Sequence, residues 1–80
     1  MKEYILYVRK YSIMINDYKL YVYRVKTNDV LHTIGEMHYR TFEHIERIDF
    51  VECTQSRLDY IKSKNLDIYD WYDKYQNTIL

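Results

Sequence analysis

The stretch Tyr4–Lys26, YILYVRKYSIMINDYKLYVYRVK, decides the architecture that we expect of this 80-residue chain. It holds two runs rich in Tyr, Val and Ile, residue types that favour β-strands, with Asn16-Asp17 between them. Asn and Asp tolerate the positive φ angles that a two-residue hairpin turn needs. The pattern therefore predicts an antiparallel hairpin in which the numbers of opposite residues add up to 33, as those of Asn16 and Asp17 do.

A third run of strand-forming residues extends from Val30 to about Arg40, after a turn at Thr27-Asn28-Asp29. Consecutive strands joined by short turns pair as antiparallel neighbours. We therefore expect a three-stranded antiparallel meander over residues 1–40.

Residues 41–80 change to a mainly helical pattern. The segment 47–53, RIDFVEC, fits a fourth strand or a helix about equally well. Ser56, followed three residues later by Asp59, resembles a capping box and predicts a helix start. The chain is thus expected to form one α+β domain: a three-stranded, or four-stranded, antiparallel meander followed by C-terminal helices packed on the sheet.

The segment Leu66–Tyr75, LDIYDWYDKY, predicts the last helix, from Asn65 to about Gln76. At about 100° per residue its aromatic side chains fall within one arc, which suits a core-facing side. Three aspartates occupy the opposite arc, either as a solvated face or as an acidic surface that engages a basic partner. These residues are Asp67, Asp70 and Asp73.

The predicted register leaves apolar side chains on both faces of the meander. One patch, at the hairpin end, includes Ile13, Ile15 and Leu20, and the other lies at the far end. A two-layer domain buries only one sheet face, so a bulge near Arg9-Lys10, helices on both faces, or a partner on one patch must account for the second. The patch assigned to a partner comprises Leu6, Val8, Val25 and Leu31.

The same register places Arg9, Arg24 and His32 side by side across the three strands. Like charges opposite one another destabilise a sheet. An acidic side chain of the second half is expected to neutralise them; the alternative is an anion-binding site for a phosphate or a partner's carboxylate.

The opposite face of the hairpin carries Lys10, Lys19, Tyr21 and Tyr23. A basic, aromatic sheet surface can stack single-stranded bases. Twelve basic residues balance twelve acidic ones in the whole chain, however, and that balance disfavours nucleic acid.

No catalytic, metal or cofactor motif is present. The three histidines and the single cysteine, Cys53, do not have the paired spacing of a zinc site. Gly35 is the only glycine, which excludes glycine-rich phosphate loops. We therefore expect no metal, no cofactor and no enzymatic activity.

The composition favours a protein that acts through its surface. The chain has eleven Tyr, two Phe and one Trp, and Tyr and Trp are frequent hot-spot residues of interfaces. We expect a small accessory protein, of the phage or mobile-element type, that binds and inhibits or redirects a larger host protein. A homodimer would use the same residues, and a single-strand nucleic-acid binder is the alternative. The lone cysteine and the lack of a signal or membrane segment predict a cytoplasmic location.

Overall fold

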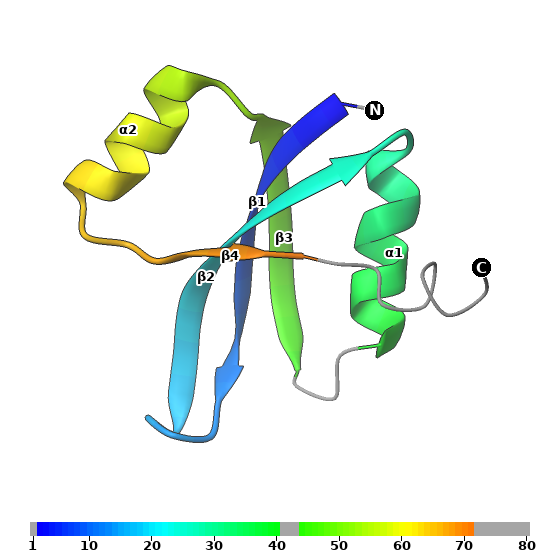
Figure 1. Cartoon of the computed structure of the whole chain (residues 1–80). Coiled ribbons are helices and arrows are strands. Elements are labelled where there is room, and N and C mark those ends of the chain that lie inside the picture. The colour runs from blue at the N-terminus through cyan, green and yellow to red at the C-terminus, as the bar shows by residue number, and fades with distance from the viewer. Residues whose placement is uncertain (1, 41–43, 72–80) are drawn as a thin grey trace.

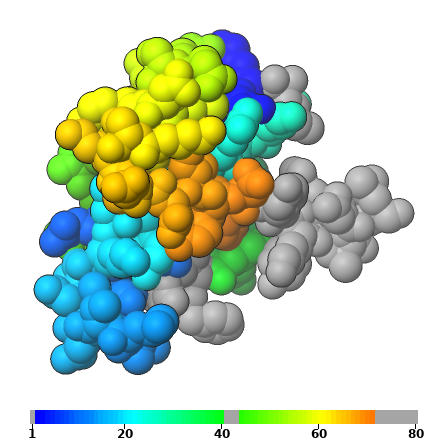
Figure 2. All heavy atoms as spheres, turned by 60° about the vertical axis from the view of Figure 1, so that its left-hand side comes forward, coloured from blue at the N-terminus to red at the C-terminus, as the bar shows by residue number. Residues whose placement is uncertain are grey.

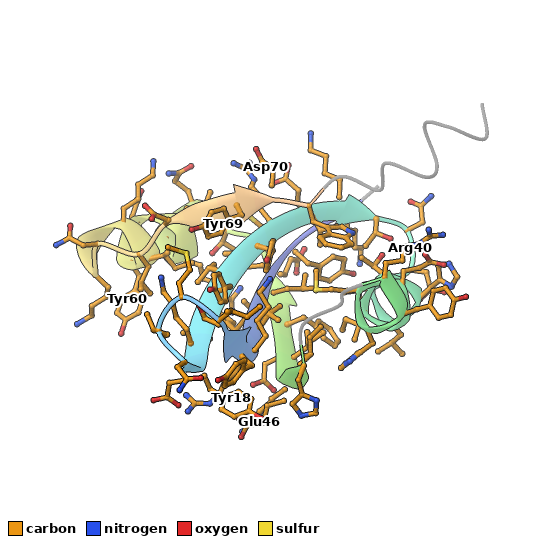
Figure 3. All side chains as sticks on the ribbon, turned by 90° about the horizontal axis from the view of Figure 1, so that it is seen from below. Tyr18, Arg40, Glu46, Tyr60, Tyr69 and Asp70 are labelled. Carbon is orange, nitrogen blue, oxygen red and sulfur yellow. The ribbon has the colours of Figure 1, made fainter. Side chains whose placement is uncertain are left out.

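The computed structural model describes residues 2–40 and 44–71, and it shows a four-stranded mixed sheet with a helix on each face (Figures 1 and 3). The strand order is β3-β1-β2-β4, with β1 antiparallel to β2 and β3, and β4 parallel to β2. The α+β class is confirmed, whereas the all-antiparallel meander is not. In chain order the elements are β1 (Lys2–Ser12), β2 (Asp17–Thr27), α1 (Val30–Arg40), β3 (Ile45–Glu52), α2 (Gln55–Ser63) and β4 (Ile68–Asp70).

The hairpin of β1 and β2 forms as expected, but its register differs from the predicted one. Ser12 pairs with Asp17, so opposite residues have numbers that add up to 29. Residues 13–16 form the turn, and Asn16 adopts the positive φ of 54°. Because the difference of four is even, each side chain that remains within β1 or β2 keeps the predicted face, although it has a different partner.

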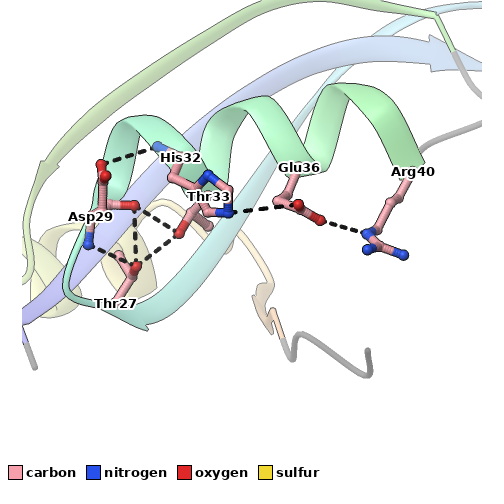
Figure 4. Close-up of polar contacts among 6 residues, drawn as sticks. All are labelled: Thr27, Asp29, His32, Thr33, Glu36 and Arg40. Atoms are coloured by element: carbon pink, nitrogen blue, oxygen red, sulfur yellow. Dashed lines mark hydrogen bonds and ion pairs between the residues drawn. The ribbon is translucent and has the colours of Figure 1, made fainter. Parts of the chain in front are cut away.

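Residues 30–40 form α1 and not a third strand. Asp29 begins this helix, because its Oδ1 accepts a hydrogen bond from the His32 amide at 3.1 Å. The Thr33 hydroxyl bonds to the Thr27 hydroxyl at 2.8 Å, which joins the helix to the end of β2 (Figure 4). The predicted turn at 27–29 is therefore a helix start.

β3 confirms the strand alternative for the segment 47–53 and pairs antiparallel with β1. The register shifts between Arg9 and Lys10, which oppose Arg47 and Ile45, so Glu46 is the extra residue of a β-bulge. The bulge lies opposite Arg9 and Lys10 but in β3; the bulge expected within the first strand is absent, because the pairing of β1 with β2 is continuous and β1 keeps its faces.

Helices cover both faces of the sheet, and each packs on its own cluster of buried apolar side chains; the predicted patch at the hairpin end, with Ile13, Ile15 and Leu20, stays exposed. The adjacent residues Ile5 and Leu6 point to opposite faces, and both are fully buried. Each buried aliphatic side chain contributes roughly 1.5–3 kcal/mol. On the α2 side the core comprises Ile5, Val22, Leu58 and Ile61; on the α1 side it comprises Leu6, Val8, Val25 and Met37.

α2 begins and ends at specific capping residues. Thr54, rather than Ser56, is the N-cap, and its hydroxyl accepts the Arg57 amide at 3.3 Å. At the other end Asn65 has φ 57° and donates its amide to the Lys62 carbonyl at 3.0 Å, as in a Schellman motif. Asn65 therefore ends one helix and does not begin another.

The predicted helix over residues 65–76 is wrong where the structure describes it. Ile68–Asp70 is a strand that pairs with Val22, Tyr23 and Arg24 of β2. Ile68 packs toward α2 and Tyr69 toward the rings of β2 on the other face. Residues 72–76 lie outside the described part of the chain.

Candidate binding surfaces

The patch that we assigned to a partner is internal. Leu6, Val8 and Val25 are at most 4% exposed and pack under α1 around Met37. Leu31 is 68% exposed, but it lies on α1 and not on a neighbouring strand. The expectation of an uncovered patch at this end of the sheet is therefore wrong, because a helix replaces the third strand and covers it.

The predicted cationic row is not assembled. Arg9 lies opposite Leu20 rather than opposite Arg24, and His32 lies on α1. No shared anion site results from these three side chains. Each instead meets its own carboxylate: Arg9–Glu46 at 3.2 Å, Arg24–Glu3 at 2.8 Å and His32–Glu36 at 3.6 Å.

The Glu3 carboxylate lies in a charged cluster with Arg24, Lys26 and Cys53 on the α2 side of the sheet. The hydrogen bond from Arg24 lowers the pKa of Glu3, and Lys26 lies 3.5 Å away. Burial, together with the neighbouring Glu3 carboxylate, raises the pKa of the Cys53 thiol. A thiol held in its protonated form is a poor nucleophile, so this cluster is suited to holding β1, β2 and β3 together rather than to catalysis.

The three aspartates do not form the acidic side of a helix. Asp67 precedes β4 and Asp70 belongs to it, and both are exposed. Asp70 pairs in register with Arg24, whose pKa is raised chiefly by the hydrogen bond to Glu3 and to a smaller extent by the negative charge of Asp70. Asp73 lies outside the described residues.

Lysine and tyrosine side chains share one face of the hairpin, as predicted. Lys10 lies opposite Lys19, and its Nζ is 3.0 Å from the Tyr23 hydroxyl and 4.6 Å from the centre of the Tyr21 ring. The Nζ of Lys19 is 5.3 Å from that ring centre. Contacts with aromatic faces stabilise both ammonium groups, so two like charges are tolerated side by side.

Tyr69 and Trp71 extend this surface, and our sequence reasoning missed them as part of it. The ring of Tyr69, labelled in Figure 3, lies 6.2 Å from that of Tyr21 and 5.8 Å from that of Tyr23. The Trp71 ring is 6.0 Å from that of Tyr23. The alternation of Tyr69 with Asp70 and Trp71 was the available signal, because alternate residues of a strand share a face. We call the whole surface the aromatic–lysine face: Lys10, Lys19, Tyr21, Tyr23, Tyr69 and Trp71.

The turn of the hairpin exposes large aliphatic side chains. Ile13, Met14 and Ile15 are 80%, 96% and 55% exposed, and Leu20, the fourth residue of β2 after the turn, is 40% exposed. We call these four residues the apolar tip. The hairpin end lies at the opposite end of the sheet from α2, blue to cyan in Figures 1 and 2. Soluble proteins seldom gather exposed aliphatic residues in this way unless the surface has a partner.

Comparisons with known proteins add no assignment: no family model, no curated protein and no solved structure matches the chain. Within residues 2–40 and 44–71, no helix has the length and apolar character to span a membrane. The same residues contain no group of three His, Cys, Asp or Glu side chains placed to hold a metal ion.

Proposed function

We propose that this chain is a small non-enzymatic module that binds a larger protein through the apolar tip of its β-hairpin. The observation that carries the proposal is the exposure of three consecutive large aliphatic side chains, 55–96%, at the turn end of the β1–β2 ribbon. A four-residue turn is normally made from Gly, Asn, Asp or Ser. Here only Asn16 is of that kind, so the turn carries apolar surface that local structure does not require.

The tip has the properties of an anchor. Burying an Ile or Met side chain against a partner contributes about 1.5–3 kcal/mol at most, and a few such residues dominate the affinity of many interfaces. The tip is also supported by eleven paired positions of β1 and β2. A rigid support reduces the entropy that binding costs.

The charges near the tip indicate the chemistry of the partner. The exposed Lys19 flanks the turn, whereas Arg9 is already paired with Glu46 and Asp17 is the acidic residue beside the turn. Complementary charges guide association and fix its register. The partner surface that fits is therefore an apolar groove with an acidic rim. We further propose, from the size and composition of the chain, that the partner is a host protein and the chain a phage- or mobile-element-type accessory product.

The decisive experiment compares two variants that lose similar amounts of exposed apolar surface. The tip variant combines Ile13→Ser, Met14→Ser and Ile15→Ser; the control combines Leu31→Ser and Tyr39→Ser on α1, where both side chains are exposed. Each protein is coupled to a resin and exposed to lysate of the source cell, and bound proteins are quantified by mass spectrometry. We expect the tip variant alone to lose a specific partner.

Thermal unfolding of both variants checks that they remain folded. If a specifically captured protein binds the tip variant as well as the native chain, the tip is not the contact surface. If the α1 control loses it instead, the docking surface lies on the helix.

The aromatic–lysine face supports a second candidate, single-stranded nucleic-acid binding. Three tyrosine rings and two ammonium groups lie on one sheet face, and a base stacked on an aromatic ring contributes about 1–3 kcal/mol. The rings also pack against one another at angles of 42–48°, which leaves less of each face open to a base. This arrangement ranks the candidate second.

A titration with a fluorescent oligonucleotide at two salt concentrations tests it. Nucleic-acid binding becomes the better-supported function if the oligonucleotide binds tightly, if binding weakens with salt, and if Tyr69→Ala and Lys19→Gln both reduce it. Binding that these substitutions leave unchanged would exclude the aromatic–lysine face as its site.

A further inference from the structure

β3 forms an edge of the sheet with one side unpaired among the described residues. β1 occupies its inner side, and the Cys53 amide donates to the Glu3 carbonyl at 2.9 Å. Because backbone groups alternate in direction along an antiparallel strand, the N–H and C=O groups of Ile48 and Phe50 point outward. The Glu52 carbonyl, two positions on, also points outward and accepts a bond from the Arg57 guanidinium at 2.9 Å. The open part of this edge is therefore centred on Ile48–Phe50.

The exposed side chains of this edge alternate in charge. Arg47 and Asp49 lie on the same face of β3, with 2.8 Å between Nε and Oδ2, and their side chains are 72% and 54% exposed. They flank Ile48 symmetrically in the sequence. If the strand is turned end to end about Ile48, Arg47 and Asp49 exchange positions, so that a positive side chain takes the place of a negative one.

We propose that two copies of this chain associate by antiparallel pairing of their β3 edges about a two-fold axis at Ile48. Ile48 then lies opposite its equivalent, and Arg47 of each copy lies opposite Asp49 of the other. Two cross-strand ion pairs and the outward backbone groups of Ile48 join the sheets. The half-exposed ring of Phe50, 41% exposed on this edge, lies beside the new strand.

The charge pattern also selects this register over its neighbours. A slip of two residues in one direction places Arg47 opposite Arg47, and a slip in the other direction places Asp49 opposite Asp49. Like charges directly opposite destabilise a strand pair, and a slip of one residue puts side chains on the wrong face. Pairing of unlike charges thus occurs in the register centred on Ile48.

This association does not depend on the apolar tip, because β3 and the turn at residues 13–16 are separate surfaces. The two-fold axis would direct the two tips of a dimer toward opposite ends of the joined sheet. A dimer would therefore offer two separate contacts to a repeated or multimeric partner, which strengthens binding through effective concentration.

A charge-exchange experiment tests the pairing. Asp49→Arg gives a chain with two positive positions, and Arg47→Asp gives one with two negative positions. We expect the native chain to reach twice its monomer mass with rising concentration in sedimentation equilibrium. Each variant alone should associate at least about tenfold more weakly, because two unlike pairs become like pairs. An equimolar mixture of the variants should regain association, because each positive position then faces a negative one.

Two controls keep the outcome interpretable. Asp59→Arg on the exposed surface of α2 makes the same charge change away from β3 and should leave association unchanged. In the native chain, hydrogen exchange at the Ile48 and Phe50 amides should slow as concentration rises. The proposal is overturned if the native chain stays monomeric with unchanged exchange, if the single variants associate like the native chain, or if their mixture fails to associate while both remain folded.

Discussion

The two ends of the β1–β2 ribbon differ in what covers them. At the end that holds Ile5 and Leu6, helices pack on both faces and these side chains are fully buried. At the turn, Ile13 and Met14 are 80% and 96% exposed although they are of the same apolar type. Composition alone therefore does not decide burial in this ribbon; the positions of α1 and α2 do.

Within the β1–β2 hairpin, the covered end stabilises the fold, whereas the exposed tip is available for binding. The covered end contains the buried clusters, and a domain of this size needs nearly all of the core that it can form. The tip contributes little buried area, so its side chains are not held by the demands of the fold. Exposed apolar side chains at the tip are therefore stronger evidence of a binding surface than apolar side chains in the core, which the fold itself requires.

The largest expected effect comes from truncating a core residue of the covered end. Leu6→Ala should lower the free energy of unfolding by roughly 2–5 kcal/mol, because it leaves a cavity between β1 and α1. Met14→Ala, at the exposed turn, should change it by less than about 0.5 kcal/mol. Denaturant unfolding followed by circular dichroism measures both, and a similar cost for the two would contradict the contrast between the ends.

A smaller effect is expected where α2 ends. Asn65 has φ 57°, and an alanine in that left-handed conformation costs roughly 1–2 kcal/mol. Asn65→Ala should therefore destabilise the α2 side of the sheet, whereas Asn65→Gly should change stability by only a few tenths of a kcal/mol. Thermal unfolding of the pair is the measurement; equal losses in both variants would show that the side chain, and not the backbone angle, matters.

The start of α2 provides a third comparison. Thr54→Ala removes the acceptor of the Arg57 amide and should cost about 1 kcal/mol. Ser56→Ala, in the first turn, should be nearly neutral, because Ser56 is not the cap. The same unfolding experiment distinguishes them, and a larger cost for Ser56→Ala would move the helix start to the position that the sequence suggested.

The sequence predicted which face of the β1–β2 hairpin each side chain occupies, but it did not predict which residues lie opposite one another. Alternation assigns each side chain to a face, and a register error of four residues leaves that assignment intact. The lysines and tyrosines of the aromatic–lysine face were therefore placed together correctly. The error arose at the turn, where Ile13–Ile15 resembled strand and Asn16, with its positive φ, was the one reliable signal.

The two misassigned segments failed for different physical reasons. The segment 66–75 was predicted as a helix because its aromatic residues fall within one helical arc, but at β4 the sheet takes apolar side chains on both faces, Ile68 toward α2 and Tyr69 toward the rings of β2. Residues 30–40 were assigned to a strand from β-branched content. Their inward residues Val30, Ile34 and Met37 nevertheless recur at helical spacing, and Asp29 was a recognisable N-cap.

The smallest expected effect concerns pH and again contrasts the two ends. The hydrogen bond from Arg24 lowers the pKa of Glu3 below its ordinary 4.5. A group with a depressed folded pKa stabilises the fold above its unfolded pKa and loses that contribution as pH falls through the folded value. Glu3→Gln should therefore reduce stability at neutral pH, and the difference from the native chain should vanish in acid.

Glu46→Gln is the matched control near the hairpin end. Its ion pair with Arg9 is about half exposed on both sides, and exposed pairs contribute little. Chemical denaturation across the acid range should give a stability gap between native and Glu3→Gln chains that closes below the ordinary pKa of Glu3, and a smaller gap for Glu46→Gln. If the two gaps are equal, the carboxylate at the covered end has no special role, and the contrast between the ends is one of apolar packing alone.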